Sequence, residues 1–61
     1  MKVVKFFRDT ENDELVSVEQ ILQEYREQER YIDVSFWEYI ENCCEKNGFL
    51  EKVPELGYTE L

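Results

Sequence analysis

The pattern of apolar and polar positions changes along the chain from a strand pattern to a helix pattern. Residues 2–8 (KVVKFFR) are rich in β-branched and aromatic side chains and carry no helix-start signal, which is typical of a β-strand. Polar turn-formers follow at 9–13, and 14–16 (ELV) is apolar again. No Asn-Gly or Asp-Gly pair separates the two runs. We therefore predict a β-hairpin over residues 1–16 with a loop longer than two residues.

A helix signal begins at Ser17, which opens the capping box 17–20 (SVEQ). In such a box the serine hydroxyl accepts a hydrogen bond from the backbone N–H three residues later, and the glutamine side chain reaches back. The apolar residues that follow recur on one helix face, at Val18, Ile21, Leu22 and Tyr25. This spacing predicts a helix over residues 17–30, with its charged face in solvent.

A second capping box at 35–38 (SFWE) predicts another helix, over residues 35–47. Asn47-Gly48 is a helix stop, since glycine suits the left-handed residue that follows a helix. The apolar face of this helix carries Phe36, Tyr39, Ile40 and Cys43. Trp37 is offset from that face, so it either covers a second side of the core or lies at an interface, and the core interpretation is slightly favoured.

The last thirteen residues have weaker patterns. Residues 49–53 are either a short third strand or an extended segment that closes over the core, and Pro54 ends this run. Residues 54–61 are predicted to be a weakly ordered tail. The chain therefore reads as one small domain, 1–61, of the α+β class. It has an N-terminal β-hairpin followed by two short capped α-helices and a possible short C-terminal strand.

A chain of 61 residues has a thin core, and chains this short usually need a disulfide, a metal or a partner subunit. The only cysteines, Cys43 and Cys44, are adjacent and cannot close a useful loop. There is no histidine, and 9–14 lacks the central glycine of a calcium loop, so neither a metal nor a cofactor is expected. These exclusions leave oligomerisation or a core richer than usual, and the small size together with nine aromatic residues favours a homodimer.

The charge is strongly negative and unevenly spread. Fifteen acidic residues against seven basic ones give −8. Residues 1–8 carry three bases and no acid (+3), whereas 9–61 carry fifteen acids and four bases (−11). This field repels phosphates, so we expect no direct contact with nucleic acid, and it favours a protein partner with a basic surface. Solubility alone explains the acidity about equally well.

No apolar run in the sequence has the length of a signal peptide or a membrane span, and the cysteines indicate a reducing compartment. We therefore expect a cytoplasmic protein without membrane contact. Catalysis is not expected either. A cysteine nucleophile needs a neighbouring base, and the carboxylates fall on faces that the apolar pattern places in solvent.

Glutamates form stripes along the two predicted helices. Glu24 and Glu27 are three residues apart, and Glu38, Glu41 and Glu45 follow three- and four-residue spacing. Such a stripe is either a solvated face or a set of carboxylates that occupies a basic groove meant for nucleic acid. With the nearby tryptophan, the candidate partner-binding residues are Glu24, Glu27, Trp37, Glu38, Glu41 and Glu45.

Four features together suggest a relationship: the opening 1–7 (MKVVKFF), then 15–20 (LVSVEQ), 36–41 (FWEYIE) and 47–51 (NGFLE). In these the chain resembles short acidic proteins encoded by phages and prophages of Gram-positive bacteria. The resemblance implies a non-catalytic inhibitor of a host antiviral defence protein, and it transfers no functional residues. The alternatives are a structural or regulatory protein acting on its own phage's proteins, or an acidic nucleic-acid mimic.

Overall fold

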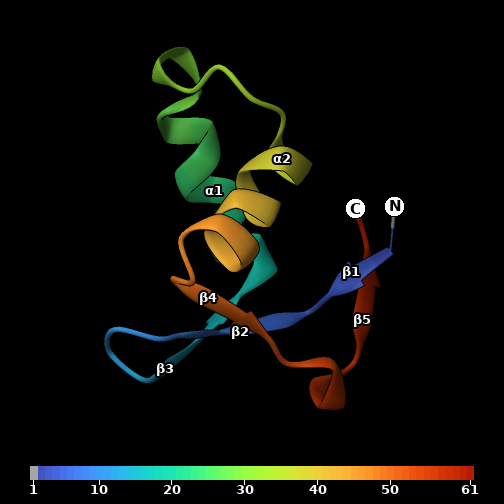
Figure 1. Cartoon of the computed structure of the whole chain (residues 1–61). Coiled ribbons are helices and arrows are strands. Elements are labelled where there is room, and N and C mark those ends of the chain that lie inside the picture. Colours follow the sequence, from blue (N-terminus) through green and yellow to red (C-terminus); the bar gives the residue numbers. More distant parts are fainter. Residues whose placement is uncertain (1) are drawn as a thin grey trace.

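In the computed structural model, which describes residues 2–61, both helices lie on the same side of the strands (Figure 1). A three-stranded sheet has the order β3-β2-β4, and β1 forms a separate two-stranded ribbon with β5. Three single turns of other helix types complete the chain, namely 3-10 turns at Glu29–Tyr31 and Pro54–Leu56 and a π turn at Asn42–Lys46. The remaining elements are β1 Lys2–Val4, β2 Phe6–Asp9, β3 Glu14–Ser17, α1 Val18–Glu27, α2 Phe36–Glu41, β4 Leu50–Lys52 and β5 Tyr58–Glu60.

Strands β1 and β2 follow one another in the chain, and along one edge they pair with the C-terminal strands β5 and β4. Phe7 lies opposite Lys52 in the antiparallel β2–β4 pair, and Val4 lies opposite Tyr58 in the β1–β5 pair. The register of the β1–β5 pair is shifted by three residues relative to that of the β2–β4 pair. The shift arises because the three-residue turn Pro54–Leu56 is inserted between β4 and β5. A long N-terminal strand is thus held by residues more than forty positions away.

The predicted hairpin is present as β2 and β3, with Phe7 opposite Val16. The prediction that the hairpin covers 1–16 is wrong for Lys2–Val4, because β1 pairs with β5 instead, and residue 1 lies outside the described residues. The prediction of a weakly ordered tail over 54–61 is also wrong, since this segment forms a 3-10 turn and a strand. A strand of three residues has too little pattern of its own, and its partner is distant in the sequence.

The third strand predicted within 49–53 is confirmed as β4. Both capping serines accept the predicted bond, Ser17 from the Gln20 N–H at 3.1 Å and Ser35 from the Glu38 N–H at 3.3 Å. The helix ends differ from the prediction. Helix α1 ends at Glu27 rather than 30, and the predicted helix 35–47 is α-helical only to Glu41. It then widens into the π turn, closed by a 2.9 Å bond from the Asn47 N–H to the Asn42 carbonyl.

The core lies between the strands and the two helices, and Phe7 at its centre is fully buried. Tyr25 joins the helices above it: its ring centroid is 5.5 Å from those of Phe36 and Tyr39, and its hydroxyl donates to the Val34 carbonyl at 2.6 Å. Trp37 is half-buried and packs against this core, as the core interpretation expected. The buried core residues are Val3, Val4, Phe7, Val18, Ile21 and Ile40.

Replacing Phe7 with alanine should remove a large part of the free energy of unfolding at 25 °C. Emptying a buried phenylalanine site costs about 3–5 kcal/mol. A domain of this length has only roughly 3–9 kcal/mol of stability at the usual 0.05–0.15 kcal/mol per residue. Leu15→Ala on the neighbouring strand is the control, because the Leu15 side chain is exposed and should change stability by no more than about 0.5 kcal/mol. Urea unfolding followed by circular dichroism measures both, and equal stabilities would contradict this account of the core.

Candidate functional site

A groove of about 360 Å³ lies between α1, the β2–β3 hairpin and the segment that follows α2. Its floor is apolar, and an exposed aromatic residue, Phe49, stands at one side. Its rim carries four carboxylates, two from the strands and one each from the hairpin loop and α1. We call this site the acidic groove: the rim is Asp9, Glu11, Glu14 and Glu24, the floor is Val16, Ile21 and Leu50, and Gln20, Tyr39, Cys43 and Phe49 complete the lining.

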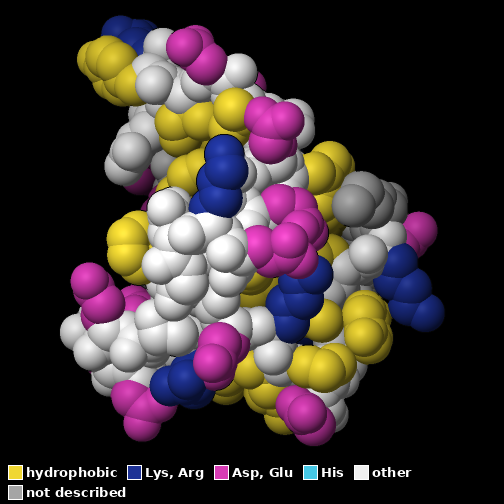
Figure 2. Space-filling view, viewed as in Figure 1, with side chains coloured by type: hydrophobic (Ala, Val, Ile, Leu, Met, Phe, Trp, Pro, Cys, Tyr) yellow, Lys and Arg dark blue, Asp and Glu magenta, His cyan; other side chains and the backbone are white. Residues whose placement is uncertain are grey.

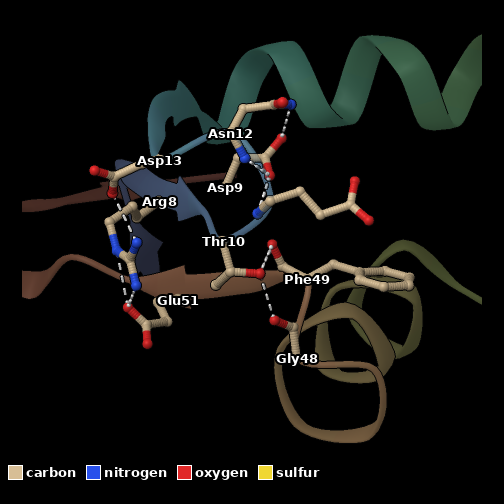
Figure 3. A network of polar contacts seen from close by, with 9 residues as sticks. Arg8, Asp9, Thr10, Asn12, Asp13, Gly48, Phe49 and Glu51 are labelled. Atoms are coloured by element: carbon tan, nitrogen blue, oxygen red, sulfur yellow. Dashed lines mark hydrogen bonds and ion pairs between the residues drawn. The ribbon is translucent and has the colours of Figure 1, made fainter.

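Phe49 is held at the groove by a set of backbone bonds (Figure 3). Gly48 takes a positive φ of 67°, which turns the chain out of the π turn. The Phe49 N–H then donates to the Cys43 carbonyl at 2.8 Å, and the Phe49 carbonyl accepts from the Thr10 N–H at 3.0 Å. The Thr10 hydroxyl also donates to the Gly48 carbonyl at 2.7 Å. The hairpin loop is therefore fastened to the segment after the helix, which closes one end of the groove.

The hairpin loop is itself ordered by Asp9. Its Oδ1 atom accepts from the backbone N–H groups of Glu11 at 2.9 Å and Asn12 at 3.3 Å (Figure 3). This is the aspartate-turn arrangement, and it fixes where the backbone of Glu11 lies. Asp13 takes a positive φ of 55° at the end of the loop, and the chain then enters β3. The Asp9 carboxylate thus holds the backbone of a second rim residue, Glu11, in place.

Arg8 neutralises two acids that lie outside the groove. Its guanidinium donates to Asp13 at 2.7 Å and, through Nε, to Glu51 at 3.0 Å (Figure 3). These hydrogen bonds, that to Glu51 first, raise the pKa of Arg8. Across residues 2–61, no ion pair involves any of the four rim carboxylates. The acidic groove therefore presents uncompensated negative charge next to apolar surface.

The rim does not form a metal site. In the described part of the chain, no three side chains of His, Cys, Asp or Glu are grouped closely enough to hold a metal ion. The carboxylates instead surround an apolar floor. Long basic side chains have the matching form, because lysine and arginine carry a charged head on an apolar stem.

The two thiols have unfavourable surroundings for a nucleophile. Burial raises the pKa of Cys43, partly offset by a hydrogen bond with Tyr39. Burial also raises the pKa of Cys44, against the opposing effect of Lys52. The pKa of Tyr39 is raised as well, by burial first and then by Cys43 and Glu24. A raised thiol pKa keeps the unreactive protonated form at neutral pH.

Stability should fall as the pH rises above about 9. The folded state holds the protons of Cys43, Cys44 and Tyr39 more tightly than the ordinary values of 9.0 for the thiols and 10.0 for the phenol. The unfolded chain therefore releases them first, and in that interval the folded state binds more protons and loses stability. The contribution of these three groups to folding stability is fully present below about pH 8. Urea midpoints at pH 7.5, 9.0 and 10.0 measure the slope.

The control is the double variant Cys43→Ala, Cys44→Ala, which removes the thiol protons and should show a shallower decline over the same interval. An unchanged slope in this variant would show that the thiols do not cause it.

The structure separates the six residues predicted from the glutamate stripes. Only Glu24 reaches the acidic groove. Trp37 and Glu41 line a second groove, and Glu41 lies 3.6 Å from the Lys52 ammonium. The other three are exposed and line neither groove, namely Glu27, Glu38 and Glu45. The six therefore do not line one groove.

Sequence reasoning missed most of the acidic groove. The pattern predicts a polar turn at 9–13 and a strand or extended segment over 49–53, and neither feature indicates a groove. The available signal was the density of acids around that turn: five of the six residues from Asp9 to Glu14 are acidic or asparagine. Only the pairing of β2 with β4 brings this loop against Phe49.

The chain matches no protein-family model, no curated protein and no solved structure. No helix within residues 2–61 is long and apolar enough to cross a membrane.

Proposed function

We propose that this chain is a non-catalytic binding protein that takes a basic segment of a protein partner into the acidic groove. The observation that supports this is the combination of an unneutralised acidic rim with an apolar floor. A groove of about 360 Å³ is at the small end of ligand sites, which suits a side chain or two rather than a large cofactor.

The groove offers each part of an arginine or lysine side chain a contact. The stem lies along the apolar side chains of Val16, Ile21 and Leu50, of which Val16 and Leu50 are partly exposed. The charged head meets the carboxylates of the rim, and the rings of Tyr39 and Phe49 give a guanidinium a surface to stack on. Arginine fits best, because its planar group both stacks and forms paired hydrogen bonds with carboxylates.

The two kinds of contact contribute differently. Exposed ion pairs give only about 0–1 kcal/mol each, so the rim alone does not produce tight binding. The stem and ring contacts supply burial, whereas the charge of −8 speeds the encounter with a basic surface and selects against acidic ones. Binding should therefore weaken as salt concentration rises, mainly through slower association.

A bound acidic protein covers the basic surface that it recognises, so the expected effect on the partner is inhibition or modulation. The resemblance to short phage proteins favours a bacterial defence protein as that partner, in the cytoplasm of the host. The same groove also serves the alternatives, in which the basic surface belongs to one of the phage's own proteins or is a nucleic-acid site that the carboxylates mimic.

Neutralising the rim should abolish partner capture, whereas an equal change of charge elsewhere should not. The rim variant is Glu11→Gln, Glu14→Gln, Glu24→Gln. The matched control is Glu27→Gln, Glu38→Gln, Glu45→Gln, on exposed positions of the helices outside the groove. Each removes three acids and changes the net charge from −8 to −5. Affinity purification from bacterial lysate with quantitative mass spectrometry compares both with the wild type.

We expect a protein that the wild type and the control variant both capture and that the rim variant loses. Loss with the control variant alone would place recognition on the glutamate stripes and contradict the groove. Equal loss with both variants would mean that net charge, and not a defined site, governs binding. Circular dichroism confirms that each variant is folded.

A further inference from the structure

A second groove, of about 210 Å³, lies between α2 and the β1–β5 ribbon. We call it the ribbon groove. Its apolar lining comes from five side chains of three elements, and charged groups stand beside it. The residues that matter for the argument are Val4, Trp37, Ile40 and Tyr58 in the lining, with Lys2 and Lys52 beside them. It shares no lining residue with the acidic groove, so an occupant of one does not fill the other.

The ribbon groove differs from the acidic groove in charge. Lys52 lies 3.6 Å from Glu41, and the Lys2 ammonium lies 5.5 Å from the centre of the Tyr58 ring. Both basic groups and one acid therefore surround apolar surface on a chain whose net charge is −8. A two-fold contact brings the same patch of each copy together, so the patch must complement itself. A patch that carries both lysine and glutamate complements itself, because a lysine of one copy can face a glutamate of the other.

The acidic groove cannot serve in the same way. Four carboxylates would face four carboxylates across the two-fold axis, and like charges brought together in an interface cost several kcal/mol. The charges therefore assign a different occupant to each groove. A basic partner fits the acidic groove, and a second copy of this chain fits the ribbon groove.

Apolar surface continues from the ribbon groove toward the end of the chain. Leu56 is 46% exposed and Tyr58 is 49% exposed, although both are large hydrophobic side chains. On the face shown in Figure 2, hydrophobic side chains gather over β5 and the turn before it. The ribbon beneath them has only two strands of three residues each, and so small a ribbon is marginally stable without further packing.

We propose that the ribbon groove and the adjoining Leu56 and Tyr58 are the interface of a two-fold homodimer. A small interface buries about 600 Å² on each partner, which is about an eighth of the 4540 Å² surface of this chain. An interface at this low end of the size range dissociates at roughly micromolar concentrations. Residues 2–61 include only six buried core residues, and the dimer gives them the added burial that so short a chain requires.

Two measurements on the wild-type chain test the interface together. Sedimentation velocity from about 1 to 500 µM should show conversion from monomer to dimer within that range. Trp37 is the only tryptophan and lines the groove, so its emission should shift to shorter wavelength over the same concentrations. A monomer throughout would overturn the proposal. A dimer without a change in Trp37 emission would also overturn it, because the copies would then meet elsewhere.

Variants locate the contact. Tyr58→Asp places a charge in the apolar part of the interface and should weaken dimerisation about tenfold or more. The matched control is Tyr31→Asp, because Tyr31 is 80% exposed and lies on the 3-10 turn after α1, outside the ribbon groove. It should leave the dissociation constant unchanged. Equal effects of the two variants would contradict the proposed interface. If Tyr58→Asp is unfolded by circular dichroism, Tyr58→Ser replaces it with the same expected direction.

Discussion

The antiparallel pairing of the first strand with the end of the chain is the constraint on which the rest of the structure depends. Residues 2–9 are bonded along one edge by residues 50–60, while β3 covers the β2 part of the other edge. Lys5, which lies between β1 and β2, continues this bonding. Its N–H donates to the Gly57 carbonyl at 3.0 Å, and its carbonyl accepts from the Val18 N–H at 2.8 Å. Both proposed binding surfaces follow from this pairing: it sets the acidic groove beside Phe49 and builds the ribbon groove.

The elements that could be predicted from the sequence are those with local causes. Two capping serines, a turn between apolar runs and a glycine after a helix each act within a few residues, and they identified the hairpin, both helices and β4. The C-terminal strand β5 could not be predicted, because its hydrogen bonds go to Lys2–Val4 at the other end of the chain. The π turn was missed for a related reason, since its wider turn leaves the apolar pattern of a helix nearly unchanged.

The candidate site was predictable only in chemical character. The net charge of −8 predicts a basic partner, and of the six candidate residues only Glu24 lines the acidic groove. Spacing along one helix reports only which residues share a face, so it grouped Glu38, Glu41 and Glu45, which line no common groove. The acidic groove is assembled from the hairpin loop, three strands, two helices and the chain between α2 and β4, and no periodic pattern spans such a set.

The most direct test of the central claim is a ¹H–¹⁵N correlation spectrum of the labelled chain during titration with a tetra-arginine peptide. We expect saturable shifts at the backbone N–H groups of Glu11, Glu14, Glu24 and Phe49, weakened by salt, and no shifts with a tetra-serine peptide. Shifts concentrated at Glu27, Glu38 and Glu45, or spread evenly over the acidic surface without saturation, would contradict it.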